Sequence, residues 1–423
     1  MTTAPFRALL LFAVWSLPCT GPVLAQTTLR VMSYNLLAFP EPVPAGRQDT
    51  LARIVDHVRP DLLLVQEIET LAGANLVLND ALNTNGVTRF SRADWVPQIS
   101  DPGSTVKLQQ LLYYDHERFT LAGQQTLTTA VRDINVYTLY VNDVDLPQSQ
   151  DTTWITVYVA HLKASTGVVN EFARQQMAQV LMDHLNSLPP GRNVIVGGDM
   201  NIYAGDEGAY TTFMTAGVGN PLDDPLTLPI SWNGNSAMAQ HHTQSTRTNT
   251  LYGEGAGGGL DDRFDMILLS QTAMNGGDRL SYVAGSCRPV GNSGTCFNDN
   301  ITDCGTGQTP FAVLRALYYM SDHLPVILDL SFDGVVAGGP ALEAPSPVAL
   351  RHAADGTLLL DADRPGTGVL ERWDAQGRLL ERRTVRFAEG TSAWPAERTA
   401  PGLQVAVLHL EHRSLRHTLI VTP

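Results

Sequence analysis

VIVGGDMN, at residues 194–201, is the stretch from which the architecture of this chain can be inferred. Its β-branched apolar start is typical of a buried strand, and its two glycines allow another backbone or a ligand to come close. Asp199 and Asn201 follow two residues apart, so on an extended segment both side chains project the same way. Taken alone, the pattern fits an Asx turn that closes a strand at least equally well. Its recurrence elsewhere favours a functional site.

Four other strand-like segments also carry chemically useful side chains at one end. They are Asn35 at the end of residues 29–35, Glu67 at the end of 61–67, His161 near the end of 153–162, and Asp322 with His323 at the start of 321–330. Each residue alone is more often a solvated strand end or a satisfied core group. Together they indicate a site, because loops at one edge of a sheet are where sites are built.

Helical periodicity appears at residues 49–58 and at about 170–188, each placed between two of these strands. Further strands are predicted at 108–114, 136–141 and 263–269.

The first 25 residues, Met1 to Ala25, have the pattern of a secretory signal peptide. Arg7 gives a positive start, residues 9–15 form an apolar core, and Val23-Leu24-Ala25 fits a cleavage site. The apolar core is too short for a permanent membrane span, and no other apolar run is long enough. We therefore expect a secreted protein, extracellular or at the cell surface, without stable membrane insertion and monomeric.

Three cysteines remain after the signal segment, namely Cys287, Cys296 and Cys304. An exported chain permits a disulfide among them, and any pairing leaves one thiol over. A zinc site is the less favoured alternative, because no histidine lies within the cluster to complete it.

The net charge of −14 argues against tight nonspecific binding to nucleic acid. It is compatible with an enzyme whose bound cation neutralises its site locally. Lys107 and Lys163 are the only lysines, so contacts of a positively charged side chain with an anionic substrate would come mainly from arginine and histidine.

The character of the sequence changes after Phe332. Residues 333–347 are rich in glycine, alanine and proline and read as a linker. Residues 348–423 alternate as strands do, with hairpin signals at 368–382 and 402–421. The pattern resembles the C-terminal sorting domain of type IX secretion cargo, which implies contact with a secretion machinery. An accessory β domain that only packs or binds is the alternative.

The ordered motifs between residues 28 and 332 resemble the endonuclease/exonuclease/phosphatase (DNase I-like) superfamily. They are Asn35 after a strand, Gln66-Glu67, Gly-Asp-x-Asn at 198–201, Arg-x-Asp at 263–265, and Ser-Asp-His-x-Pro at 321–325. The resemblance implies that residues 26–332 form a four-layered α/β sandwich, two mainly antiparallel sheets flanked by helices. A small C-terminal β-sandwich follows. A long cysteine-bearing loop between Asp265 and Asp322 departs from the pattern.

The resemblance also implies a metal-dependent phosphodiester hydrolase. Mg²⁺ prefers oxygen ligands, and Mn²⁺ and Ca²⁺ are the alternatives. Glu67 is the main candidate ligand, with Asn35 and Asp322 reaching the ion directly or through water.

The remaining site residues take roles carried over from the family. Asp199 orients or deprotonates the attacking water, and Asn201 donates hydrogen bonds to the phosphate. His161 stabilises the phosphorane or protonates the leaving oxygen. His323 contacts the phosphate and is held by Asp265. Whether the base is Asp199 or the His323–Asp265 pair stays open.

Arg247 and Arg263, together with Asn35, are the candidate phosphate-binding residues, because guanidinium groups recognise phosphate well. For Arg263 a structural salt bridge is an equal alternative.

We expect a secreted endonuclease acting on nucleic acid. The alternatives are the same chemistry on a phospholipid such as sphingomyelin or on a small phosphate ester, and a non-catalytic binding module. A membrane-acting enzyme should expose an apolar hairpin, and the loop 285–309 is mostly polar. The full set of candidate residues argues against a mere binding module.

Overall fold

The structure is a computed structural model of the 423-residue chain. It describes residues 27–41, 46–105, 108–251, 254–305, 307–336, 349–352, 357–362, 365–374, 379–388, 390–395, 402–409 and 414–421. The chain forms two compact units, Met1–Gly339 and Pro340–Pro423. The predicted signal segment 1–25 and residues 337–347 of the predicted linker lie outside the described residues.

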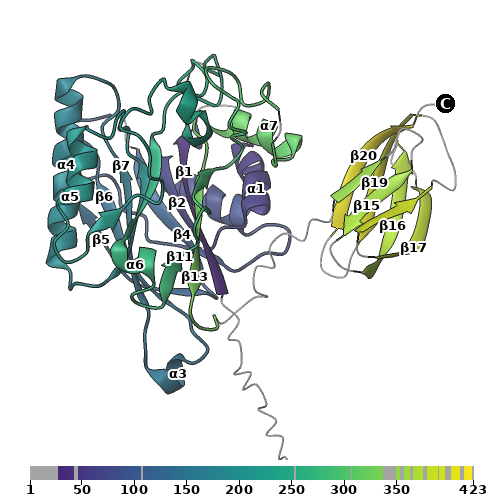
Figure 1. Cartoon of the computed structure of the whole chain (residues 1–423), viewed down its shortest axis with the longest axis horizontal. Helices are drawn as coiled ribbons and strands as arrows, with labels where there is room; N and C mark the ends of the chain where they lie inside the picture. Colours follow the sequence, from purple (N-terminus) through teal and green to yellow (C-terminus); the bar gives the residue numbers. More distant parts are fainter. Residues whose placement is uncertain are drawn as a thin grey trace, which may run out of the picture. The chain divides into compact units, whose positions relative to one another are not determined.

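Two sheets form the centre of the first unit (Figure 1). The seven-stranded sheet runs in the order β11 (Leu280–Tyr282), β13 (Val326–Phe332), β1 (Thr27–Phe39), β2 (Leu62–Ile68), β4 (Gln109–Asp115) and β3 (Phe90–Arg92), with β12 (Arg288–Pro289) beside β13. The six-stranded sheet runs β5 (Phe119–Leu127), β6 (Ile134–Val141), β7 (Trp154–His161), β8 (Asn193–Asp199), β10 (Asp265–Ser270) and β9 (Leu222–Asp223). Neighbours are antiparallel except β1–β2 and β7–β8, which are parallel.

Helices cover the outer faces of both sheets. In Figure 1, α1 (Arg47–Val58) and α7 (Phe311–Met320) lie on one side, and α4 (Val168–Ser187) and α5 (Gly208–Thr215) lie on the other. The shorter helices are α2 (Leu71–Leu76), η1 (Val77–Leu82), α3 (Leu146–Ser149), η2 (Ser236–His241) and α6 (Gln271–Asn275). The predicted four-layered α/β sandwich is therefore confirmed. Among the described residues, no helix is both long and apolar enough to cross a membrane.

Strand β7 shows why the central strands are apolar on both faces. Ile155, Val157 and Val159 belong to the core that includes both sheets, whereas Tyr158 and Ala160 pack in the core beneath α4. Successive side chains point to opposite faces, so a strand in an inner layer needs apolar residues at every position.

The two glycines of the VIVGGDMN stretch permit two close approaches. A Cβ at Gly197 would lie 2.6 Å from Leu64 Cδ2 of the facing sheet. A Cβ at Gly198 would lie 1.8 Å from the carbonyl oxygen of Ala160 on β7. The prediction that these glycines let another part of the chain come close is confirmed, and in both cases that part is protein.

Some elements differ from the expectation. Strand β5 and helix α7 were not predicted, and the last strand of the first unit begins at Val326 rather than at Ser321. Pro325 precedes that strand, and proline cannot donate a ladder hydrogen bond. Cys296 and Cys304 form a disulfide and Cys287 is buried and free, so the zinc alternative is wrong.

The second unit contains two antiparallel sheets. One holds β14 (Ala349–His352), β15 (Leu358–Ala362) and β18 (Gly390–Trp394), and the other holds β17 (Leu379–Phe387), β16 (Gly366–Asp374), β19 (Gly402–His409) and β20 (Ser414–Val421). The predicted hairpin pairings β16–β17 and β19–β20 are confirmed. Leu358, Leu360, Leu370, Val385, Ala406 and Leu408 form a small core, as a β-sandwich requires.

Candidate active site

The two parallel strand pairs bring the polar strand ends to one edge of the sandwich. Asn35 and Glu67 lie toward the carboxyl ends of β1 and β2, and His161 and Asp199 end β7 and β8 as paired neighbours. Asp265 begins β10 opposite Asp199, since those strands are antiparallel. Carboxyl ends of parallel strands meet at one sheet edge, so the topology itself assembles these residues.

Register shifts in the sheet direct the side chains of Asn35 and Glu67 toward the site. The β1–β2 register shifts between Asn35 and Phe39, and the β2–β4 register shifts between Val65 and Ile68. Such bulges redirect side chains at strand ends. Glu67 also has φ +64°, a conformation that is uncommon outside glycine and recurs at functional sites.

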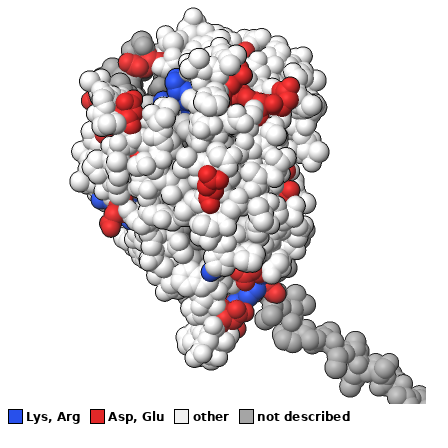
Figure 2. Space-filling model, turned by 90° about the vertical axis from the view of Figure 1, so that its left-hand side faces the viewer, with Lys and Arg blue, Asp and Glu red and all other residues white. Residues whose placement is uncertain are grey.

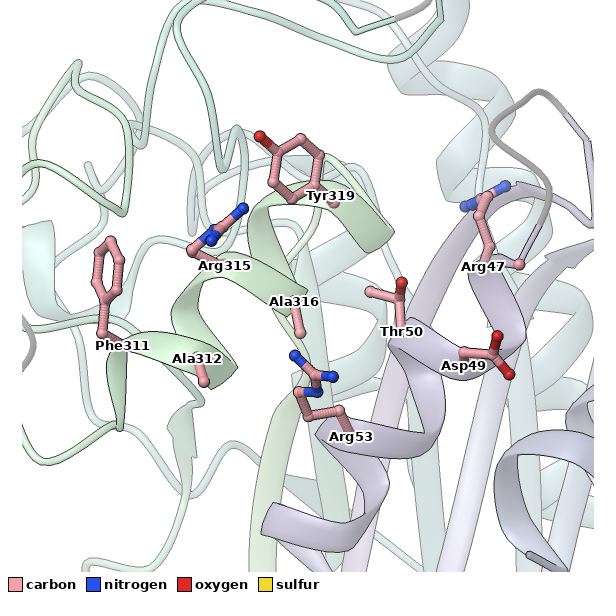
Figure 3. A pocket seen from close by; sticks show the side chains of 10 residues that line it. Arg47, Asp49, Thr50, Arg53, Phe311, Ala312, Arg315, Ala316 and Tyr319 are labelled. Carbon is pink, nitrogen blue, oxygen red and sulfur yellow. The ribbon is translucent and has the colours of Figure 1, made fainter. Parts of the chain in front are cut away.

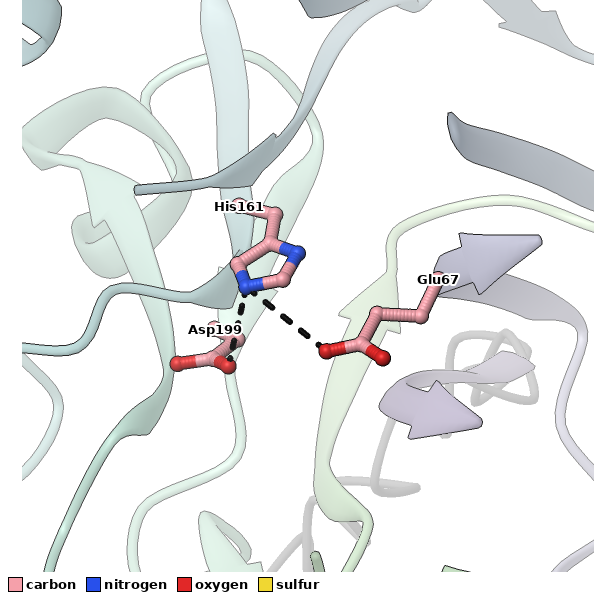
Figure 4. A group of neighbouring side chains, drawn as sticks. All are labelled: Glu67, His161 and Asp199. Atoms are coloured by element: carbon pink, nitrogen blue, oxygen red, sulfur yellow. Dashed lines mark ion pairs between the residues drawn. The ribbon is translucent and has the colours of Figure 1, made fainter. Parts of the chain in front are cut away.

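Glu67, His161 and Asp199 form a compact group of potential metal ligands (Figure 4). His161 Nε2 lies 3.4 Å from Asp199 Oδ2 and 3.8 Å from Glu67 Oε1. One ligand atom from each residue falls within 4.8 Å of the others. His161 was not predicted as a ligand, because the pairing of β7 with β8 is not visible in the local sequence.

Asn35 bridges the two carboxylates of this group. Its Nδ2 donates to Glu67 Oε1 at 2.9 Å and to Asp199 Oδ2 at 3.0 Å, while its Oδ1 accepts from the Leu37 amide at 3.0 Å. The amide nitrogen, not the oxygen, therefore faces the group. In this orientation Asn35 holds the two carboxylates in place, and its contact with a metal ion, directly or through water, stays a prediction.

His323 and Asp265 form the pair that the family resemblance implies. His323 Nδ1 lies 2.8 Å from Asp265 Oδ2, and both side chains are buried. His323 Nε2 faces the group, 3.6 Å from Asp199 Oδ2. Burial opposes the imidazolium form, but the carboxylates of Asp265, Asp199 and Asp322 outweigh it and raise the pKa of His323 well above its usual range.

Asp322 is held by the polar segment and the glycine-rich loop that precede α7. Its Oδ2 accepts from the Ala256 amide at 2.6 Å and from Gln244 Nε2 at 3.0 Å. Gln244 Nε2 also lies 2.7 Å from His323 Nε2. Asp322 lies outside the ligand group of Glu67, His161 and Asp199, and its contact with the ion, directly or through water, stays a prediction. It acts electrostatically on His323 and anchors the loop.

Asp199 sits at the centre of these contacts. Burial raises the pKa of its carboxyl group to about 7; the charge of His323 opposes the rise, and those of Asp265 and Glu67 add to it. Asp199 Oδ1 also accepts from the Asn201 amide at 3.0 Å, which is the Asx turn considered from the sequence. The Asx turn is therefore present, and the catalytic role of Asp199 stays a prediction.

His161 is chemically different from His323. Burial, followed by the charges of Arg132, His323 and Lys163, lowers the pKa of His161 well below its usual range. A neutral imidazole offers a lone pair and is the form that binds metals. His161 Nδ1 is buried and has no hydrogen-bond partner among the described residues.

The donor set fits a divalent cation. The carboxylates of Glu67 and Asp199 and the neutral imidazole of His161 converge from three strands. The negative charges of the two carboxylates repel each other in a buried place, and a bound cation would offset that repulsion. Carboxylate oxygens suit Mg²⁺ and Mn²⁺, whereas imidazole nitrogen is a better ligand for transition metals such as Zn²⁺ and Fe²⁺.

Asn201 occupies the turn directly after β8. It is buried, has φ +50°, and its Nδ2 lies 3.4 Å from the Leu162 carbonyl. That carbonyl follows His161, so Asn201 joins the ends of β7 and β8 at the edge of the ligand group.

The predicted phosphate-binding role of Arg247 and Arg263 is contradicted. Each arginine is 2% exposed. Arg247 Nη1 donates to the carbonyls of Tyr318 and Ser321, and Arg263 Nη2 donates to both carboxylate oxygens of Asp224. Their guanidinium groups are committed to protein, and for Arg263 the salt-bridge alternative is correct.

Arg132 and Lys163 are cations of the site that sequence reasoning missed. Arg132 is partly buried, its Nη1 donates to the Leu162 carbonyl at 2.8 Å, and the negative charges of Glu67 and Asp199 act on it. Lys163 follows His161 by two residues. Arg132 lies in a loop before β6 without a recognisable motif, so only the folded structure places it near the ligand group.

A protein-family model and several solved structures are similar to this chain. The protein-family model described as endonuclease/exonuclease/phosphatase family matches residues 32–354. No curated protein sequence matches the chain. Among solved structures, the human Nocturnin catalytic domain with bound sulfate is 20% identical, covers 73% of this chain and 96% of its own, and has a TM-score of 0.44.

Two other solved structures have similar scores. An endonuclease/exonuclease/phosphatase from Beutenbergia cavernae is 17% identical over 93% of this chain and 100% of its own, with a TM-score of 0.44. D. rerio TDP2 complexed with a single-strand DNA product is 15% identical over 72% of this chain and 98% of its own, also with a TM-score of 0.44. At this similarity none of the three assigns a substrate to this chain.

Proposed function

The chain belongs to the endonuclease/exonuclease/phosphatase family, and from that premise we propose that it is a metal-dependent hydrolase of phosphodiester bonds in nucleic acid. The observation that carries the proposal is the convergence of Glu67, His161 and Asp199 beside the His323–Asp265 pair. Phosphoryl transfer requires charge stabilisation around phosphorus and a positioned water, and these residues can provide both.

A divalent cation held by Glu67, Asp199 and His161 would polarise the phosphate and offset the negative charge that develops on it. Asp199 orients the attacking water and accepts its proton as the water oxygen bonds to phosphorus; the bond from phosphorus to the ester oxygen breaks, and that oxygen takes a proton from solvent. His323 donates from Nε2 to a phosphate oxygen, because Asp265 holds its Nδ1. Asn201 and Arg132 lie at the edge of the group and can donate to the remaining oxygens.

The test is a side-by-side assay with the purified, EDTA-treated full chain. Single-stranded DNA, duplex DNA, RNA, sphingomyelin vesicles and inositol phosphates are each incubated with Mg²⁺ or Mn²⁺. We expect cleavage of a nucleic acid that stops when the metal is chelated. Hydrolysis of none of these substrates with either metal would overturn the proposal.

A lipid phosphodiester is the second candidate substrate, and one observation favours it. Val168, Val169 and Phe172, at the start of α4, are 80%, 82% and 60% exposed. They follow His161 closely, and Arg174 fixes the intervening loop through the Lys163 and Ser165 carbonyls. An exposed apolar patch beside a phosphodiesterase site suits a membrane surface.

This candidate has its own discriminating variant. Replacing Val168, Val169 and Phe172 by serine should abolish vesicle hydrolysis but not oligonucleotide cleavage if the substrate is lipid. If both rates are unchanged, the patch has no part in substrate binding.

We also propose that the protein is exported and that the C-terminal β-sandwich serves sorting. The signal-like segment 1–25 and the Cys296–Cys304 disulfide support export, because disulfides persist in oxidising compartments. Intact-mass analysis of protein from the culture medium should find a chain that begins at Gln26. An intracellular chain beginning at Met1 would contradict export.

A further inference from the structure

A cavity of about 420 Å³ lies between α1 and α7, outside the group of catalytic candidates (Figure 3). We refer to it as the α1–α7 cavity. Its lining residues are Gly46, Arg47, Asp49, Thr50 and Arg53 from the α1 side and Phe311, Ala312, Arg315, Ala316 and Tyr319 from α7. Its volume is within the range of sites that bind small molecules or single residues of a polymer.

Two arginines give the cavity a positive character. Arg53 and Arg315 are exposed, and neither has an ion pair or a hydrogen bond within the described part of the chain. Figure 3 shows Arg53 between the two helices and Arg315 directed toward Tyr319. The Cζ atom of Arg315 lies 5.9 Å from the centroid of the Tyr319 ring. Among the described residues that line the cavity, Asp49 is the only one with a carboxylate. Guanidinium groups without an ion pair or a hydrogen bond, in a chain of net charge −14, favour an anionic ligand.

Aromatic side chains stand beside these arginines. Phe311 is 53% exposed and Tyr319 is 42% exposed, although large apolar side chains are usually buried. Aromatic faces next to cationic groups are the combination with which proteins bind single-stranded nucleic acid, because bases stack on the rings and phosphates pair with the cations.

The cavity is joined to the catalytic edge through Arg47. The Arg47 guanidinium donates to the carbonyls of Leu36 and Leu37, just after Asn35, and to that of Met320, two residues before Asp322. The Tyr319 end of the cavity therefore adjoins the segments that carry Asn35, Asp322 and His323. From Tyr319 to Phe311 the cavity follows α7 for about 12 Å, at 1.5 Å per residue.

The opposite side of the molecule has a different character. Figure 2 shows the face that α4 and α5 occupy in Figure 1, which carries scattered acidic groups and few basic ones. A phosphate backbone would gain little electrostatic attraction there.

We propose that the α1–α7 cavity is a subsite for a single-stranded nucleic-acid segment that flanks the bond being cleaved. Arg53 and Arg315 pair with its phosphates, and Phe311 and Tyr319 stack with its bases. This inference rests on the proposed function and deepens it, since it names a single strand longer than the scissile dinucleotide as the preferred substrate.

The experiment measures kcat/KM of the full chain for a dinucleotide and for a 12-nucleotide single strand over a range of salt concentrations. For the Arg53→Ala/Arg315→Ala variant, the ratio of kcat/KM between the long and the short substrate should fall at least tenfold. The slope of log(kcat/KM) against log[salt] for the long strand should decrease by about 1.4, the change expected for two lost phosphate contacts on a single strand.

A second variant separates stacking from charge. Phe311→Ala should lower the ratio about five- to a hundredfold, the range for one lost base stack, with an unchanged salt slope. Arg192→Ala, which removes a half-buried arginine just before β8, at the opposite end of that strand from Asp199, is the control and should change neither quantity.

Two outcomes overturn the inference in distinguishable ways. If the wild type prefers the long strand and the double-arginine variant keeps the wild-type ratio and salt slope, the cavity is not a subsite but the proposed function stands. If the wild type cleaves neither substrate, the proposed function fails, and the subsite falls with it before any variant is compared.

Discussion

At the scale of single residues, the contact between His323 and Asp265 sets the charge of the site. Asp265 offsets the effect of burial on His323, so the imidazolium form persists to a higher pH than usual. Removing the Asp265 charge should lower the pKa of His323. Because the cation is present only below that pKa, the alkaline decline of activity should then begin at a lower pH.

We therefore predict that Asp265→Asn shifts the alkaline limb of the pH profile of kcat/KM to lower pH. His323→Ala and Asp265→Asn should each reduce activity about a hundredfold or more, the scale of removing one acid–base or electrostatic group. The double variant should be little worse than either single one, since residues that act as a unit are non-additive. Fully multiplicative losses would show that the two act independently.

Substitutions of Arg132 and Arg263 should have different effects, one on the rate of catalysis and the other on the stability of the fold. Arg132→Ala should lower kcat/KM about tenfold or more and leave the free energy of unfolding nearly unchanged. Arg263→Ala should instead destabilise the fold by about 3–5 kcal/mol, because it leaves the buried Asp224 carboxylate without its partner. Steady-state kinetics and urea unfolding of both variants provide the check; the reverse pattern would contradict these roles.

The residues at strand ends could be predicted because a buried strand is a short apolar run in the sequence, and the polar residue that follows marks its end. Asn35, Glu67, His161 and Asp199 were found in this way. The direction of long side chains could not be predicted, since Arg247 and Arg263 turn into the protein whereas Arg132 faces the site. Gln244 was missed because it acts from a loop whose path depends on Asp322 and His323.

At the scale of elements, the fold depends on strands that come unusually close. Gly198→Ala places a Cβ against the Ala160 carbonyl on β7, which is backbone and cannot move aside. We predict a loss of about 3 kcal/mol or more in the free energy of unfolding, as for severe overpacking. Gly123→Ala on β5, which meets no atom within 4 Å, is the control and should change it by about 0.5 kcal/mol or less. Equal urea midpoints for the two variants would contradict this account.

The elements with strong periodicity were predicted well, and the others were not. Helices α1 and α4 and the inner strands have clear apolar patterns. Strand β5 lies at a sheet edge, and its residues are mostly half-buried or exposed, so its apolar pattern is weak. Helix α7 is short and follows the long disulfide-bearing loop, in which no regular pattern leads up to it.

At the scale of the whole molecule, the two units have separate cores. Residues 333–336 hydrogen-bond with the first unit, as the contacts of Asp333 with Arg279 and of Val335 with Val144 illustrate. We predict that a chain ending at Gly339 folds and keeps the wild-type kcat/KM on a short substrate. Circular dichroism and kinetics of that truncation provide the check, and an insoluble or inactive product would contradict the independence of the first unit.

The measurement closest to the central claim compares the wild type with Glu67→Gln during metal titration. Glutamine keeps the volume of Glu67 but removes the negative charge that it contributes to the ligand group. Nucleic-acid cleavage is followed while Mg²⁺ or Mn²⁺ is returned to EDTA-treated protein. We predict that the variant folds normally and is nearly inactive at low metal concentration. Wild-type turnover at low metal concentration in Glu67→Gln would show that Glu67 is not a ligand and would contradict the proposed site.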